Sequence, residues 1–187
     1  VAYRFESSAN SRYSLSASAS RLNPDGVGES SSRGELGLGY EVDLSEGFNL
    51  NATAGAVRTN ALRSKTDPVG ALRLTFTGER LDYAVAWSRY VSAGGSLGAY
   101  TRAESLETSL TYPFTVNTSL SLGIARARSL ETNGDAGVSA FARIRSELTR
   151  FWAFTLCFEQ RRAKPFGGPT ARGNSVAVGL VYAHPNF

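Results

Sequence analysis

Few side chains in this sequence could carry out acid–base or nucleophilic chemistry. The single histidine, His184, is followed only by Pro185, Asn186 and Phe187, and no serine or carboxylate stands beside it to form a catalytic pair. The single cysteine, Cys157, lies on the polar side of an alternating segment without a histidine to activate it. We therefore expect no catalytic residues and no enzymatic activity.

Metal and cofactor chemistry find no support in the residue pattern either. One Cys and one His do not supply the four ligands of a structural zinc site. Glu41 and Asp43 share one side of an extended segment, but this spacing follows from strand geometry and does not indicate a glycosidase pair. Gly37 and Gly39 lack the strand-to-helix setting of a dinucleotide loop. We expect no bound metal and no cofactor.

Composition removes further classes of protein. The 187 residues hold 20 Lys and Arg against 16 Asp and Glu, and the net charge of +4 is spread along the chain, so nucleic acid is not an expected partner. No apolar run reaches the roughly 18 residues that a transmembrane helix needs. The chain contains no methionine, which indicates a processed product or a piece of a longer polypeptide.

Alternation of apolar and polar residues predicts an all-β fold. Between Phe48 and Ala56 every second residue is apolar, and the residues between them are Asn, Asn, Thr and Gly. This period of two is typical of a strand with one apolar and one polar face. It recurs along the chain and predicts eleven strands, near residues 1–5, 13–19, 36–44, 48–56, 72–76, 81–87, 106–112, 120–124, 140–148, 152–158 and 176–182.

The connections between these strands alternate in length. Short turns are predicted near residues 8–11, 45–47, 77–80, 113–115 and 149–150, and long polar loops near residues 22–34, 59–70, 91–101, 127–138 and 163–173. Hairpins with tight turns at one end and long loops at the other are typical of an antiparallel, up-and-down transmembrane β-barrel. A soluble β-sandwich also alternates in this way and stays an alternative.

Two groups of residues mark depth on the apolar face. Aromatic residues gather near the short turns, which matches the belt of aromatic rings at a membrane interface. The positions that continue five apolar rows toward the long loops are all arginine, which could pair with the phosphates of lipopolysaccharide, although basic residues also tolerate strand ends in general. The predicted periplasmic girdle is Tyr13, Tyr40, Phe48, Phe76, Tyr83, Tyr112, Trp152 and Tyr182, and the predicted outer rim is Arg21, Arg58, Arg89, Arg126 and Arg162.

The opposite face of the predicted strands is polar and charged. In a closed barrel this face lines the interior, and walls of mixed charge are typical of a hydrated channel. The charges could also pair across strands and only stabilise the wall. The predicted lining residues are Arg4, Arg12, Glu35, Glu41, Arg73, Asp82, Glu107, Arg143, Arg145, Glu147 and Glu159. Aromatic residues are nearly absent from this face, which favours small hydrophilic solutes, or a plugged, structural barrel, over a polysaccharide path.

An odd number of strands has a consequence for topology. Bacterial single-chain barrels have even numbers of strands with both ends in the periplasm. We therefore expect residues 1–187 to form one barrel domain, or the C-terminal part of a barrel of about 12 to 18 strands whose upstream strands belong to the same chain or to another subunit. A miscount by one strand is the alternative.

Several stretches resemble a known family. The hairpins "LGLGYEVDLSEGFNLNATAGAVR" and "SLTYPFTVNTSLSLGIARAR" and the ending "NSVAVGLVYAHPNF" are similar to bacterial outer-membrane β-barrel porins of the porin-2 and exopolysaccharide-export type. The resemblance implies an outer-membrane location, a periplasmic C-terminus and recognition of the terminal Phe187 by the barrel-assembly machinery. Phe187 is out of register with the apolar row that ends at Tyr182.

Three functions are compatible with these features. The first is a porin-like channel or conduit for hydrophilic solutes or polysaccharide, in contact with outer-membrane lipid and lipopolysaccharide. The second is a structural outer-membrane barrel that scaffolds or encloses other subunits of an envelope complex. The third is a soluble β-sandwich or adhesin module, which would dissolve without detergent.

Overall fold

The computed structural model describes residues 2–22, 31–60, 64–94, 99–130, 135–165 and 167–182. Within these ranges the regular elements are eleven β-strands. The same ranges contain no helix that is long and apolar enough to span a membrane. The strands are β1 (Ala2–Ser8), β2 (Ser11–Leu22), β3 (Ser31–Ser45), β4 (Phe48–Asn60), β5 (Ser64–Thr77), β6 (Asp82–Gly94), β7 (Ala99–Thr115), β8 (Thr118–Ser129), β9 (Ala136–Glu147), β10 (Trp152–Lys164) and β11 (Ala171–Tyr182).

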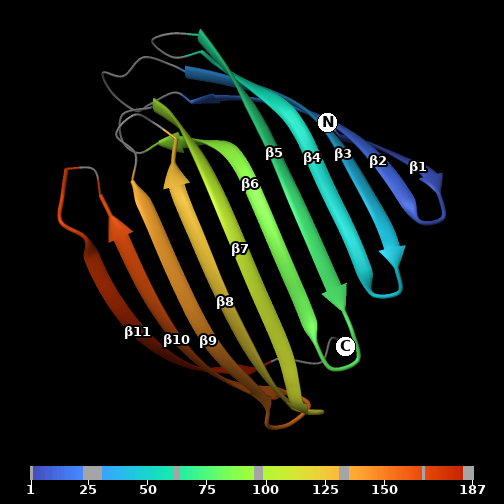
Figure 1. The fold of residues 1–187 in the computed structure, drawn as a ribbon, viewed down its shortest axis with the longest axis vertical. Coiled ribbons are helices and arrows are strands. Elements are labelled where there is room, and N and C mark those ends of the chain that lie inside the picture. Colours follow the sequence, from blue (N-terminus) through green and yellow to red (C-terminus); the bar gives the residue numbers. More distant parts are fainter. Residues whose placement is uncertain are drawn as a thin grey trace.

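All eleven strands belong to one antiparallel sheet in sequential order, β1 to β11 (Figure 1). Each strand pairs with the strand before it and the strand after it, so the chain runs up and down without crossovers. The predicted all-β, up-and-down fold and the eleven strands are confirmed. The β-sandwich alternative is wrong for this part of the chain, because a sandwich needs two packed sheets.

The strands are longer than predicted on the side of the long loops. The loop expected at residues 59–70 is wrong, since the ladder between β4 and β5 continues through the pair Val57 and Asp67 to the pair Asn60 and Ser64. The turn expected at residues 113–115 also lies within β7, where Pro113 pairs with Ser119 before a bulge. Backbone groups carry the ladder, so a strand continues after its apolar alternation has ended.

The strands are strongly staggered relative to one another. Cross-strand partners can be followed from Tyr13, near the start of β2 and its short turn, to Arg162, near the loop end of β10. Such stagger accompanies the tilt of strands in a barrel and lets a sheet curve toward closure. The row of partners is Phe5, Tyr13, Tyr40, Ala52, Leu72, Trp87, Leu106, Arg126, Val138, Arg162 and Arg172.

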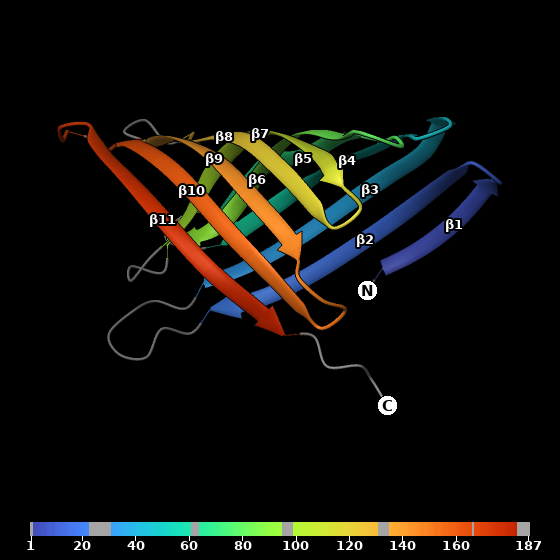
Figure 2. The same ribbon diagram turned by 90° about the horizontal axis from the view of Figure 1, so that it is seen from below.

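Seen from below, the sheet bends into an arch with β1 and β2 on one side and β11 on the other (Figure 2). The two edge strands do not pair with each other within the described residues. Glycine permits a close approach between β3 and β4, because a β-carbon on Gly55 would meet the carbonyl oxygen of Leu36 and lie 2.9 Å from the Cα of Gly37. The two backbones therefore approach too closely for any side chain at position 55.

Gly55→Ala is expected to destabilise the folded sheet by about 1–3 kcal/mol, the usual cost of overpacking a tight site. Gly34→Ala, on neighbouring β3, is the matched control, since a β-carbon there has nothing within 4 Å. The measurement is the midpoint of urea unfolding in detergent micelles, followed by tryptophan fluorescence. Equal midpoints for the two variants would contradict the close approach at Gly55.

Candidate functional site

The two faces of the sheet differ in chemistry and in exposure. On β3, Leu36 and Leu38 are 59% and 65% exposed, whereas Glu35, Gly37 and Gly39 between them are half-buried. The less exposed, polar face is therefore the concave side of the arch. Few apolar side chains in the described part are buried, namely Val57, Val91 and Ala153. The apolar rows thus cover the outside of the molecule and do not form a core.

The predicted lining residues share one face of the sheet. Cross-strand pairing links them in register, as between Arg12 and Glu41 or between Asn51 and Arg73, and this face is the concave one. Their role in lining a channel stays a prediction. The residues on this face are Arg4, Arg12, Glu35, Glu41, Arg73, Asp82, Glu107, Arg143, Arg145, Glu147 and Glu159.

One ion-pair network joins β1, β2 and β3 on the concave face. Glu41 accepts a 2.7 Å hydrogen bond from Arg4 Nη2 and lies 3.6 Å from Arg12 Nη1. Arg12 Nε is in turn 3.7 Å from Glu6 Oε1. Because these groups are at least a quarter exposed, they add little to stability and mainly fix one another's positions.

A second set of charges lies farther along the sheet. Glu159 and Arg161 form a bidentate pair at 2.6 and 2.8 Å on β10. Arg143 and Arg145 lie on neighbouring β9 and have no hydrogen bond or ion pair within the described residues. Their cross-strand neighbours carry short side chains, Ser121 and Cys157 for Arg143 and Ser119 and Thr155 for Arg145. Neither guanidinium group is thus held by a carboxylate of the described residues, although that of Arg143 lies over the ring of Phe141.

A hollow of about 270 Å³ lies on the concave side over β2 to β6. The backbones of Gly37, Gly39 and Gly55 form part of its floor, so missing side chains create the space. Its polar lining includes Ser14, Ser16, Arg33, Glu35, Thr53, Ser88 and Tyr90. The mixture of hydroxyl groups and one ion pair, Arg33 with Glu35 at 2.6 Å, suits a hydrated ligand.

The expectation that the polar face nearly lacks aromatic residues is wrong at two positions. Tyr90 lines the hollow, and the ring of Phe141 lies over Gly123 on β8 while Arg143 lies 5.6 Å from the ring centroid. The alternation did not reveal Phe141 as a residue of the polar face, because its neighbours Ala140 and Ala142 are apolar as well. The available signal was the glycine directly opposite it, which becomes readable once the register of β8 and β9 is known.

The loop ends of the β4–β5 hairpin and the β6–β7 hairpin lie against each other. The registered ladder between β5 and β6 stops at Gly70 and Arg89, just past Pro68, which has no N–H to donate. Beyond this point Asp67, on the concave face of β5, lies 3.3 Å from Arg102 Nη1, on the convex face of β7. For these side chains to meet, the end of the β6–β7 hairpin must fold onto the concave side of the β4–β5 hairpin.

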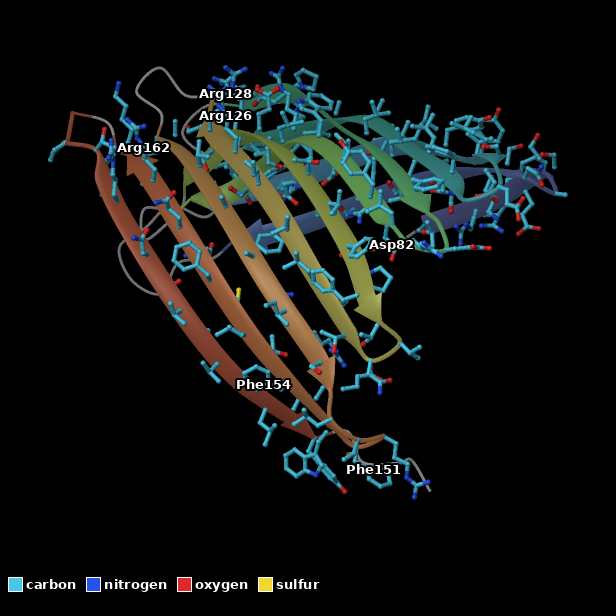
Figure 3. The ribbon with its side chains drawn as sticks, turned by 60° about the horizontal axis from the view of Figure 1, so that its bottom comes forward. Asp82, Arg126, Arg128, Phe151, Phe154 and Arg162 are labelled. Carbon is cyan, nitrogen blue, oxygen red and sulfur yellow. The ribbon has the colours of Figure 1, made fainter. Side chains whose placement is uncertain are left out.

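The convex face carries the predicted girdle and rim residues. The aromatic rings meet in pairs near the short turns, as for Tyr13 with Tyr40 at 4.9 Å and Phe48 with Phe76 at 4.5 Å between centroids. Figure 3 shows Arg126 and Arg162 toward one end of the sheet and Phe154 toward the other. Their contact with a membrane stays a prediction. Phe187 and His184 lie outside the described residues.

Comparison with known proteins supports the fold. The chain is similar to a NanC porin structure in a rhombohedral crystal form, with a TM-score of 0.53, 10% identity, and coverage of 98% of this chain and 97% of that one. A KdgM porin structure gives a TM-score of 0.41 at 13% identity, over 98% of each chain. No protein-family model and no curated protein sequence matches the chain. The similarity to the NanC porin structure shows that the chain shares the antiparallel, up-and-down β-barrel fold of that structure.

Asp67→Asn is expected to loosen the end of the β6–β7 hairpin. The side chain of Asp67 is 7% exposed and that of Arg102 is 24% exposed, so removing the carboxylate charge removes an ion pair between two poorly exposed groups. We expect a lower unfolding midpoint, by about 1–3 kcal/mol of stability. The control is Asp43→Asn, because the carboxylate of Asp43 accepts one exposed hydrogen bond from Asn49 Nδ2. Equal stability of the two variants would contradict the folded-in hairpin.

Proposed function

We propose that the chain forms an outer-membrane β-barrel whose polar interior passes hydrophilic solutes. The observation that carries the proposal is the inverted distribution of side chains, with large apolar residues exposed on the convex face and charged residues on the concave face. Water would make the exposed apolar face costly, whereas the hydrocarbon of a bilayer would make it favourable. The porin fold agrees with this arrangement.

A bilayer also sets requirements for the edges of the sheet. Unpaired N–H and C=O groups are costly in hydrocarbon, so β1 and β11 must pair, with one another or with further strands, when the protein is in the membrane. Barrels of this kind have short turns in the periplasm and longer loops outside. We therefore propose that the girdle and the end of β11 at Tyr182 face the periplasm. The barrel-assembly machinery would then meet Phe187 there.

The interior chemistry supports small hydrophilic solutes as the cargo. Charges of both signs and hydroxyl groups occupy the concave face, and the guanidinium groups of Arg143 and Arg145, which have no carboxylate partner among the described residues, offer contacts to a passing solute. Tyr90 and Phe141 are aromatic, but Phe141 is engaged with Gly123 and Arg143 and does not form an open platform. A polysaccharide path would need a series of exposed rings.

Conductance across a planar bilayer, with Cys157 as the reporter, tests this proposal. Cys157 is the single cysteine of the chain and faces the concave side, where it pairs with Arg143 and Ala177. We expect stepwise channels whose conductance falls when a water-soluble methanethiosulfonate reagent adds a charged group to the thiol. Cys157→Ser should conduct without responding to the reagent. A protein that inserts but carries no current, and that copurifies with an envelope subunit, would instead support the structural barrel.

Ion selectivity tests the role of these two arginines. Arg143→Glu with Arg145→Glu should shift the reversal potential in a salt gradient toward that of a cation-selective channel, because two positive charges of the proposed wall are replaced by two negative charges. The matched control is Arg162→Glu with Arg172→Glu, which makes the same charge change on the convex face. An equal shift in both double variants would contradict the assignment of the faces.

A further inference from the structure

A polar groove interrupts the apolar convex face where β6, β7 and β8 approach their loop ends. Its volume is about 180 Å³, and it is lined by Trp87, Glu104, Ser105, Leu106, Arg126 and Arg128. Of these residues only Arg126 belongs to the rim predicted from the sequence. We name Trp87, Glu104, Arg126 and Arg128 the rim cluster. Figure 3 shows that Arg126 and Arg128 lie together at this end of the sheet.

Glu104 holds the rim cluster together. One carboxylate oxygen accepts a 2.6 Å hydrogen bond from the indole N–H of Trp87, and the other accepts hydrogen bonds from Arg128, at 2.7 Å from Nε and 2.6 Å from Nη2. These contacts join three neighbouring strands. Glu104 is therefore neutralised and fixes the orientation of the Arg128 guanidinium, whose side chain stays 53% exposed.

The remaining charge of the groove is positive and unused. Arg126 makes no hydrogen bond or ion pair within the described residues, although it lines the groove beside Arg128. Arg89 is the cross-strand partner of Glu104, and its Nε is buried without a hydrogen-bond partner in the same part of the structure. The groove itself is lined by two guanidinium groups and one carboxylate, which leaves a net charge of +1, and the cross-strand neighbour Arg89 adds a further positive charge beside it.

The surroundings of the groove select the kind of anion. Leu106 and Ile124, which lie beside and below it on the same face, are 50% and 54% exposed. An anion in this place would have its charged group at the arginines and apolar chains along these residues. Guanidinium groups pair with phosphate oxygens in a bidentate manner, and amphipathic side chains favour this depth.

We propose that the rim cluster binds a phosphate group of an outer-leaflet lipid, namely a phosphorylated sugar of the lipopolysaccharide headgroup. Arg126 and Arg128 contact the phosphate, Glu104 and Trp87 position Arg128, and Leu106 and Ile124 contact the acyl region. This inference rests on the proposed membrane location, and it adds to it a defined lipid site on three strands.

Trp87 provides a direct measurement of binding. The chain has two tryptophans, so the full chain with Trp152→Phe reports from Trp87 alone. This protein, held in detergent micelles, is titrated with lipopolysaccharide, and we expect a saturable change in Trp87 fluorescence. Arg126→Gln with Arg128→Gln should weaken the apparent affinity about tenfold or more, as expected when charge-assisted hydrogen bonds are lost. The control is Arg80→Gln with Arg150→Gln, which removes the same charge near the short turns.

Further arms identify the source of the phosphate. Phosphatidylcholine or inorganic phosphate, added to the same protein in detergent micelles, should give no saturable change in Trp87 fluorescence. A response to inorganic phosphate equal to that of lipopolysaccharide would overturn the lipid assignment, and an equal loss of affinity in both double variants would overturn the site. Conductance of the wild type is measured in parallel. A conducting wild type without the lipopolysaccharide response refutes this inference alone, whereas a response without conductance refutes the channel.

Discussion

The continuous register of the antiparallel ladder is the constraint on which the other features depend. Side chains alternate with a period of two, so a slip of one residue in any strand would exchange its polar and apolar faces. The same register places Glu41 between Arg4 and Arg12 on one face and brings Trp87 to Glu104 on the other. The concave charge network and the rim cluster are therefore two consequences of one set of backbone pairings.

Two local features of the wall depend on residues without side chains and on the end of one ladder. Gly55 allows β3 and β4 to approach closely, and the neighbouring glycines open the hollow above them. At Pro68 and Gly70 the ladder between β5 and β6 ends, so the β6–β7 hairpin is released from the wall and meets Asp67 through Arg102. Neighbouring strands thus approach closely where a side chain is missing, and the ladder between β5 and β6 ends beside Pro68, which lacks a backbone donor.

The faces of the strands were predictable from the sequence, and the contacts between distant hairpins were not. A period of two is visible in single segments, so the placement of residues such as Arg73 and Glu107 on one face followed directly. The ladder at residues 57–60 escaped prediction because polar residues end the alternation there without ending the strand. The pair of Asp67 and Arg102 depends on how two hairpins overlap, and no local pattern encodes this overlap.

Charged side chains are paired in different ways on the two faces, and this difference agrees with the environment proposed for each face. On the concave face several pairs join residues two apart on one strand, as in Glu159 with Arg161 and Arg33 with Glu35, while Arg143 and Arg145 have no carboxylate partner among the described residues. A hydrated interior tolerates this, because water screens charges and exposed ion pairs contribute little to stability. On the convex face Glu104 has both oxygens engaged by partners on two other strands. A carboxylate near hydrocarbon requires such complete satisfaction, since an unpaired charge there is far more costly than one in water.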